Sequence, residues 1–160
     1  ISPRRITLST SGIGQKIKEL SKVAPPINLA ISLNATTDEI RDYLMPINKT
    51  YPISQLLEAC RNYPLPKGKR ITFEYVLIKN INDSLKDAER LVKLLKGIPS
   101  KINLIPFNPF PGTKFERPDE KTILAFQDIL LRHNMTAIIR KSKGLDIEAA
   151  CGQLKGKRTE

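Results

Sequence analysis

Five short segments rich in β-branched and apolar residues alternate along the chain with segments whose apolar residues recur every three or four positions. The short segments predict β-strands, and the periodic segments predict amphipathic helices. The expected strands span residues 4–9, 27–32, 71–78, 101–105 and 135–140. Strands that alternate with helices form parallel sheets with right-handed crossovers, so the pattern predicts an α/β fold.

Local signals predict where several helices begin. Thr36 and Glu39 have the spacing of a capping box, which predicts a helix start at this point. Asp83 and Asp119 each precede a periodic segment and are therefore predicted to cap the helices that follow.

Polar side chains gather where the expected strands end. These ends contain residues 9–11, 32–34 and 80–83, Asn108, and the segment 140–151. In parallel sheets and barrels, ligands bind at the carboxyl ends of strands. Small hydroxyls and amides suit a neutral or zwitterionic ligand, and these ends lack the paired carboxylates of a glycosidase or a decisive general base. The sequence therefore indicates a site for a cofactor that brings its own chemistry.

The charge of the chain points to a polyanionic partner. Its 160 residues suit one domain, and 27 Lys and Arg against 16 Asp and Glu give a net charge of +11. Nucleic acid is the simplest such partner, and solvated lysines of an ordinary basic protein are the alternative. With 6% aromatic residues and no Trp, base stacking is not expected to be the main binding device. The candidate RNA contacts are Lys141, Lys143, Lys155, Lys157 and Arg158.

The two cysteines have different expected roles. Two are too few for a disulfide scaffold, which fits a reducing cytoplasm as the predicted location. Cys60 shares a helical face with Ile53 and Leu57, so we expect it in the core. Cys151 lies among small residues after the basic segment 140–144, and it is either a reactive thiolate or a small buried residue.

No residues have metal-ligand spacing, so the chain itself is expected to bind no metal. No apolar run could span a membrane, so no membrane partner is expected.

Six motifs carry a resemblance to a known family. They are LSTSG at 8–12, AISLNA at 30–35, MPINK at 45–49, FEYV at 73–76, KINLIPFNPFPG at 101–112 and AACGQL at 149–154. Over nearly its whole length, the chain resembles the C-terminal half of the radical S-adenosylmethionine RNA methyltransferases of the RlmN and Cfr type. The resemblance implies a partial (β/α) TIM-like barrel of about five parallel strands with outer helices, incomplete because the N-terminal part is missing. It also implies that residues 1–154 are the C-terminal part of the catalytic domain and that 155–160 are a basic mobile tail.

The same resemblance implies an activity. RlmN-like enzymes methylate carbon 2 of an adenosine in large-subunit ribosomal RNA and in transfer RNA. One S-adenosylmethionine methylates a cysteine, which Cys151 matches, and a second is cleaved reductively to a radical that takes hydrogen from that methyl group. The full-length enzyme uses a [4Fe-4S] cluster and an electron donor such as flavodoxin. The positions that line the S-adenosylmethionine site are matched by Ser9, Ser32, Leu33, Asn34 and Asn108.

The chain departs from the family pattern in two respects. It has no CxxxCxxC iron–sulfur motif and no N-terminal RNA-binding domain, and Asn34 stands where the relatives usually have His. We therefore expect a fragment of a longer enzyme that is inactive by itself. The alternatives are a carbon-8 methyltransferase of the Cfr type and a basic α/β domain that only binds RNA.

Overall fold

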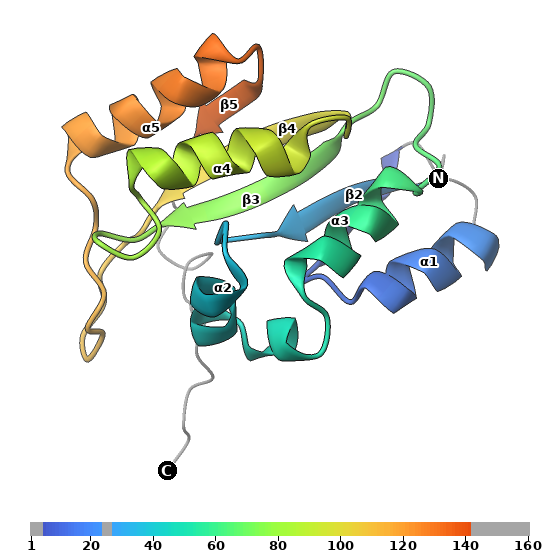
Figure 1. Ribbon diagram of the computed structural model, residues 1–160, viewed down its shortest axis with the longest axis horizontal. Helices are drawn as coiled ribbons and strands as arrows, with labels where there is room; N and C mark the ends of the chain where they lie inside the picture. Colours follow the sequence, from blue (N-terminus) through green and yellow to red (C-terminus); the bar gives the residue numbers. More distant parts are fainter. Residues whose placement is uncertain (1–4, 24–26, 142–160) are drawn as a thin grey trace.

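In the computed structural model, which describes residues 5–23 and 27–141, five parallel strands form one sheet in the order β1-β2-β3-β4-β5 (Figure 1). The strands are β1 (Thr7–Thr10), β2 (Asn28–Ser32), β3 (Ile71–Leu77), β4 (Ser100–Pro106) and β5 (Thr136–Ile139). The helices are α1 (Gly14–Val23), α2 (Asp38–Leu44), α3 (Ile53–Arg61), α4 (Leu85–Leu95) and α5 (Glu120–Arg132), and the 3-10 helix η2 (Pro46–Lys49) follows α2. The predicted alternation of strands and helices is confirmed.

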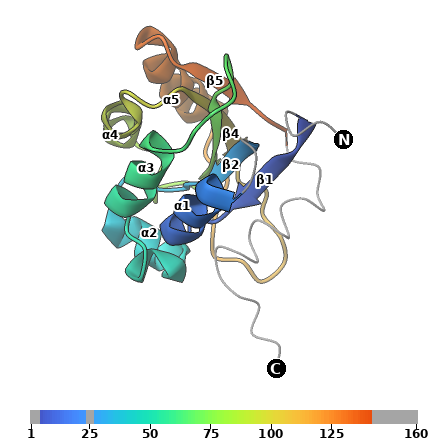
Figure 2. The ribbon, with the colours of Figure 1, turned by 90° about the vertical axis from the view of Figure 1, so that its right-hand side faces the viewer.

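The sequential strand order places α1, α3, α4 and α5 on one side of the sheet (Figure 2). Each right-handed crossover leads to the next strand in the same direction, and it therefore leaves its helix on the same face. The wall of a (β/α) barrel is built in this way, whereas the strand order of a doubly wound sheet reverses. The predicted fold class, an α/β arrangement that forms part of a (β/α) barrel, is confirmed. Among the described residues, no helix is long and apolar enough to cross a membrane.

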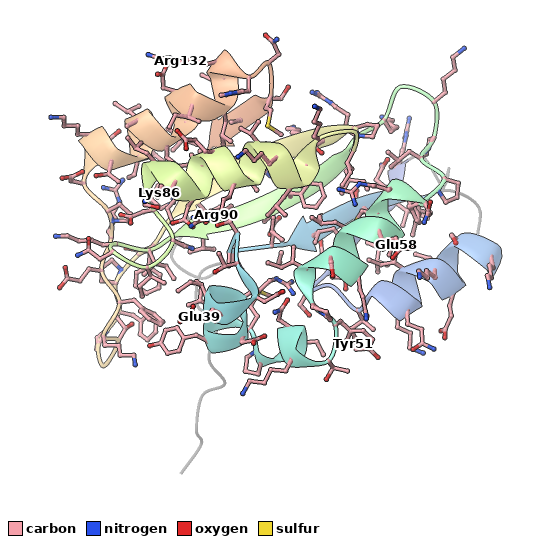
Figure 3. All side chains as sticks on the ribbon, viewed as in Figure 1. Glu39, Tyr51, Glu58, Lys86, Arg90 and Arg132 are labelled. Carbon is pink, nitrogen blue, oxygen red and sulfur yellow. The ribbon has the colours of Figure 1, made fainter. Side chains whose placement is uncertain are left out.

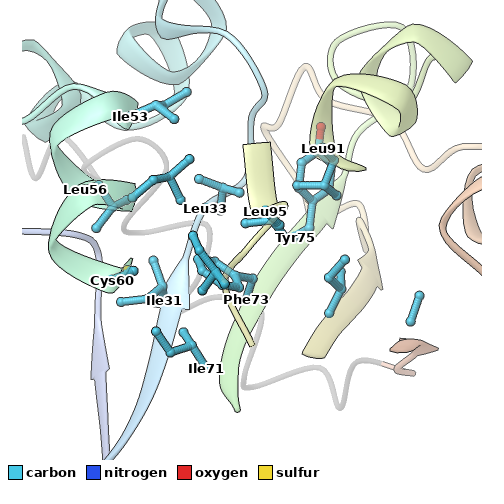
Figure 4. Close-up of a cluster of buried hydrophobic side chains, with 14 of the residues drawn as sticks. Ile31, Leu33, Ile53, Leu56, Cys60, Ile71, Phe73, Tyr75, Leu91 and Leu95 are labelled. Atoms are coloured by element: carbon cyan, nitrogen blue, oxygen red, sulfur yellow. The ribbon is translucent and has the colours of Figure 1, made fainter. Parts of the chain in front are cut away.

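The main hydrophobic core lies between the sheet and these helices (Figure 4). Alternate residues of β3, from Ile71 through Phe73 and Tyr75 to Leu77, are fully buried in it. Cys60 on α3 belongs to the same core with 2% of its surface exposed, and burial raises the pKa of its thiol to about 12. The prediction that Cys60 is a core residue is confirmed.

Two predicted helix caps are displaced by one residue. Thr37 caps α2, while the Thr36 hydroxyl donates instead to Oδ1 of Asp87 at 2.6 Å. Ser84 caps α4 and forms a capping box with Asp87, so Asp83 is not the cap. Both predictions were wrong because adjacent residues of the same capping type compete, and the direction of chain entry decides which side chain reaches the free N–H groups.

Candidate functional site

A buried arginine joins the carboxyl ends of β1 and β2. Arg41 on α2 has 0% of its surface exposed. Its Nη2 donates to the carbonyl oxygens of Ser11 at 2.7 Å and Ser32 at 3.0 Å, and its Nε donates to the carbonyl oxygen of Leu33 at 2.9 Å. The planar guanidinium can hold several acceptors at once, so one side chain fixes both strand ends relative to each other.

The charge of Arg41 is balanced through an amide. Its Nη1 donates to Oδ1 of Asn48 at 3.0 Å, and Nδ2 of Asn48 donates to the carboxylates of Asp38 at 3.0 Å and Asp42 at 2.7 Å. Burial lowers the pKa of Arg41 to about 10, against the raising effect of the nearby Asp38 and Asp42 charges. Because a pKa of about 10 is well above 7, the guanidinium remains charged at neutral pH. A Cβ on Gly12 would lie 3.0 Å from Nη2, so this close approach requires glycine.

Two asparagines join the loops that follow β2 and β3. Oδ1 of Asn34 accepts from the backbone N–H of Val76 at 2.9 Å, and Asn34 has a φ of 60°, which asparagine tolerates better than most residues. Nδ2 of Asn82 donates to the carbonyl oxygens of Asn34 at 2.8 Å and Val76 at 2.7 Å. Oδ1 of Asn82 accepts from the N–H of Ile78 at 2.7 Å. These bonds fix the carboxyl edge of the sheet beyond the last strand pairs.

The predicted site residues differ in their accessibility. Ser9 on β1 is exposed, and Ser32 at the end of β2 is half-buried. Both lie on the face opposite the helices. The chain neighbours of Ser32 belong to the helix-facing core, so Ser32 itself points away from the helices, and Ser9 pairs with a β2 residue that points the same way as Ser32. Leu33 and Asn34 are buried, and the polar groups described above are already bonded within the protein. Asn108 is exposed, two residues beyond the end of β4. Contact of these five residues with a ligand stays a prediction.

Several predicted residues lie outside the described part of the chain. They are Cys151, the segment 155–160, and four of the five candidate RNA contacts, Lys143, Lys155, Lys157 and Arg158. Within residues 5–23 and 27–141, no group of three or more His, Cys, Asp and Glu side chains could hold a metal ion.

Sequence reasoning missed two polar residues on the same face as Ser32. Ser32 pairs with Glu74 on β3, and Glu74 pairs with Asn103 on β4. Because Phe73 and Tyr75 face the helices, Glu74 between them faces the opposite side. A single acidic residue inside an apolar strand was the signal that could have identified Glu74 from the sequence.

Comparison with known proteins gives consistent matches, although no protein-family model matches the chain. The chain is 59% identical over 158 residues to a "Dual-specificity RNA methyltransferase RlmN" from Syntrophotalea carbinolica, covering 99% of the chain and 42% of that protein. It is 55% identical over 157 residues to a protein of the same name from Nautilia profundicola, covering 98% of the chain and 44% of that protein. The chain thus spans less than half the length of these curated relatives.

Solved structures agree with these matches. A radical SAM methyltransferase from Sphaerobacter thermophilus is 46% identical with a TM-score of 0.85, over 97% of the chain and 46% of that structure. A domain of pyruvate-formate lyase-activating enzyme from Bacteroides vulgatus has a TM-score of 0.61 at 18% identity, over 84% of the chain and 80% of that domain, and this likeness concerns the fold alone. The resemblance of the chain to part of a radical S-adenosylmethionine methyltransferase of the RlmN type is confirmed.

Proposed function

We propose that this chain, which is similar along nearly all its residues to the RlmN methyltransferases, is part of a radical S-adenosylmethionine enzyme that methylates carbon 2 of adenosine in large-subunit ribosomal RNA and transfer RNA. The observation that carries the proposal is the 55–59% identity over 98–99% of the chain to proteins named as dual-specificity RNA methyltransferases. In this proposal residues 1–154 are the C-terminal part of the catalytic domain, and residues 155–160 are a basic tail.

The exposed face of the sheet fits S-adenosylmethionine as the cofactor. Ser9 and Ser32 present hydroxyls on this face, and the exposed Asn108 follows β4 at the carboxyl edge. We assign the binding of the cofactor to these three side chains and to the backbone around Leu33 and Asn34. Arg41 bonds to the carbonyls of Ser32 and Leu33 and to that of Ser11, so the backbone that carries Ser32 is held in place relative to the end of β1.

Cys151 is the proposed methyl carrier. S-adenosylmethionine supplies the methyl group and, with a [4Fe-4S] cluster whose cysteine ligands are outside this chain, the radical chemistry. The basic residues 140–144 favour the thiolate of a nearby cysteine, and a thiolate is the form of sulfur that accepts a methyl group.

The partners follow from the same proposal. A net charge of +11 suits contact with the phosphates of ribosomal and transfer RNA, with Lys141 as the one candidate RNA contact among the described residues. The full-length enzyme would receive electrons from a donor such as flavodoxin and act in the cytoplasm.

The test uses the full-length protein that contains this chain, purified without oxygen and supplied with iron and sulfide. It is incubated with S-adenosylmethionine, a reductant and either a large-subunit ribosomal RNA fragment or a transfer RNA. Digestion and mass spectrometry should find 2-methyladenosine in both RNAs. A product of 8-methyladenosine would replace carbon 2 by carbon 8 as the target. Absence of any methylated adenosine despite an intact cluster would overturn the proposal.

Two cysteine variants test the carrier. Cys151→Ala should abolish RNA methylation, because alanine has no group that can accept the methyl. Cys60→Ala is the matched control and should retain methylation, since Cys60 is buried in the helix-facing core. Methylation by Cys151→Ala with an intact cluster would contradict the assigned role.

A further inference from the structure

Positive charge is concentrated at the amino edge of the sheet, where the strands begin. Three connections lead there from a helix into the next strand, namely residues 62–70 before β3, 96–99 before β4 and 133–135 before β5. Together they carry four Lys and Arg residues and no Asp or Glu. The connections 78–84 and 107–119 at the carboxyl edge carry three Lys and Arg against three Asp and Glu. The excess of positive charge therefore belongs to one end of the sheet.

The loop before β3 presents most of this charge to solvent. Lys67, Lys69 and Arg70 are exposed, and the loop projects past the start of the strands (Figure 1). The backbone N–H of Lys69 donates to the carbonyl oxygen of Pro66 at 3.0 Å, which closes a turn. Nη1 of Arg70 donates to Oγ1 of Thr136 on β5 at 2.6 Å. The turn and this bond hold the loop in place, so its cations are presented from a fixed position.

A hollow of about 710 Å³ opens at the same edge, between the C-terminal ends of α4 and α5. Lys93 and Lys96 line it, and Glu89 is the one acidic residue among its described lining residues. The loop before β3 lies beside this hollow, because the N–H of Ile71 donates to the carbonyl oxygen of Pro99 at 2.8 Å. The exposed cations thus border a concave surface.

Helix dipoles explain only part of this charge. Lys93 and Lys96 lie at the C-terminal end of α4, where cations are favourable. Lys67 and Lys69 follow the end of α3 by six residues or more, beyond the reach of its last turn. Neither of them, nor Lys96, forms an ion pair with a residue in the described part of the chain. Like charges repel one another, so their concentration without acidic neighbours points to an anionic partner.

We propose that the amino-edge basic surface, formed by Lys67, Lys69, Arg70 and Lys96, binds backbone phosphates of the RNA substrate at a distance from the methylated adenosine. This inference rests on the proposed function. β3 has seven residues and is therefore about 23 Å long, and the proposed catalytic residues lie beyond its far end. An RNA stem covers this length with fewer than about ten base pairs. An electron donor would instead have to approach the cluster beside S-adenosylmethionine, so RNA fits this end of the sheet better than an acidic protein.

The test compares two RNAs in filter binding to the full-length protein with its cluster, over a series of salt concentrations. One RNA is a transfer RNA, and the other is a stem-loop of about five base pairs around the same target adenosine, too short to reach the amino edge. The variant is Lys67→Gln/Lys69→Gln/Lys96→Gln. It should bind transfer RNA more weakly, and the slope of the logarithm of the binding constant against the logarithm of the salt concentration should fall by about 2–3, because each lost phosphate contact removes about 0.9. Binding of the short stem-loop and the melting temperature should stay unchanged.

The matched control is Lys16→Gln/Lys18→Gln/Lys86→Gln. It removes the same charge from exposed lysines on the outer surfaces of α1 and α4, and Lys86 lies at the opposite end of α4 from Lys96 (Figure 3). We expect the control to retain the wild-type slope with both RNAs.

Three results would overturn the inference. They are a wild-type slope in the amino-edge variant, an equal loss in the control, which would show an effect of net charge alone, and an equal loss with the short stem-loop. If the amino-edge variant kept the wild-type slope but bound a flavodoxin more weakly, the surface would belong to an acidic protein partner. A wild-type protein that binds transfer RNA through this surface yet methylates no adenosine would overturn the proposed function and leave the surface assigned.

Discussion

Replacement of Arg41 by lysine should destabilise the protein strongly although the charge is kept. The guanidinium of Arg41 donates to three main-chain carbonyls, of Ser11, Ser32 and Leu33, and to the side chain of Asn48. Its four bonds leave from three nitrogens in one plane. Lysine concentrates its three donors on a single nitrogen, so it cannot span these acceptors.

The size of the effect follows from the acceptors that lose their donor. If lysine still reaches two of the four, the other two remain unpaired in a buried site. Each unpaired group costs about 1–3 kcal/mol, which gives a total loss of about 2–6 kcal/mol. Since natural proteins are stable by about 5–15 kcal/mol, this loss is a large part of the free energy of unfolding.

The assay is urea-induced unfolding followed by circular dichroism, with Arg132→Lys as the control. Arg132 bonds to Asp128 at 2.8 Å on the surface of α5, where its side chain is 75% exposed, so its replacement should leave the midpoint within experimental error. Arg41→Lys should also weaken binding of S-adenosylmethionine, because the ends of β1 and β2 would no longer be held together. Unfolding of Arg41→Lys at the wild-type midpoint would refute this reasoning.

Three further predictions concern the core, the acid stability and the loop after β1. Cys60, with a thiol pKa of about 12, should resist alkylation by iodoacetamide at pH 8 in the folded protein and should react in urea. Mass spectrometry of the peptide that contains Cys60 measures the alkylation. Rapid alkylation of the folded protein would contradict the burial of Cys60. Burial alone would raise the pKa of Asp87, but its hydrogen bonds and a nearby arginine lower this pKa below the ordinary value. The ionised Asp87 therefore stabilises the folded protein above about pH 4, and this stabilisation is lost as the pH falls through the folded-state pKa. Asp87→Asn should therefore reduce the loss of unfolding free energy on acidification, and an unchanged pH profile would argue against this. Gly12→Ala should lower the free energy of unfolding by more than about 1 kcal/mol, because φ is +102° and the new Cβ would lie 2.9 Å from Leu56 and 3.0 Å from Arg41; an unchanged urea midpoint would show that the loop adapts.

The sequence by itself determined the elements and the chemistry expected at their ends. Period-two and helical patterns located the five strands and the helices between them, because burial of one face imposes these periods locally. Asp119 was correctly predicted as the cap of α5, where its side chain accepts from the N–H of Thr122 at 2.9 Å. The same local reasoning placed Cys60 in the core. Ser9 and Ser32 were likewise expected where two strand patterns end, and the structure places both on the face opposite the helices.

Only the tertiary structure decided the strand order and the partners of charged groups. Alternating strands and helices are compatible with a reversing order and with a sequential one, and pairing between distant segments selects the latter. Arg41 is an ordinary surface residue by its sequence, yet it is fully buried because carbonyls from two separate segments, at Ser11 and at Ser32–Leu33, converge on it. The neighbourhood of Glu74 and Asn103 depends on the register of β3 against β4. Contacts of this kind join residues far apart in the chain, and no local pattern of hydrophobic and polar positions encodes them.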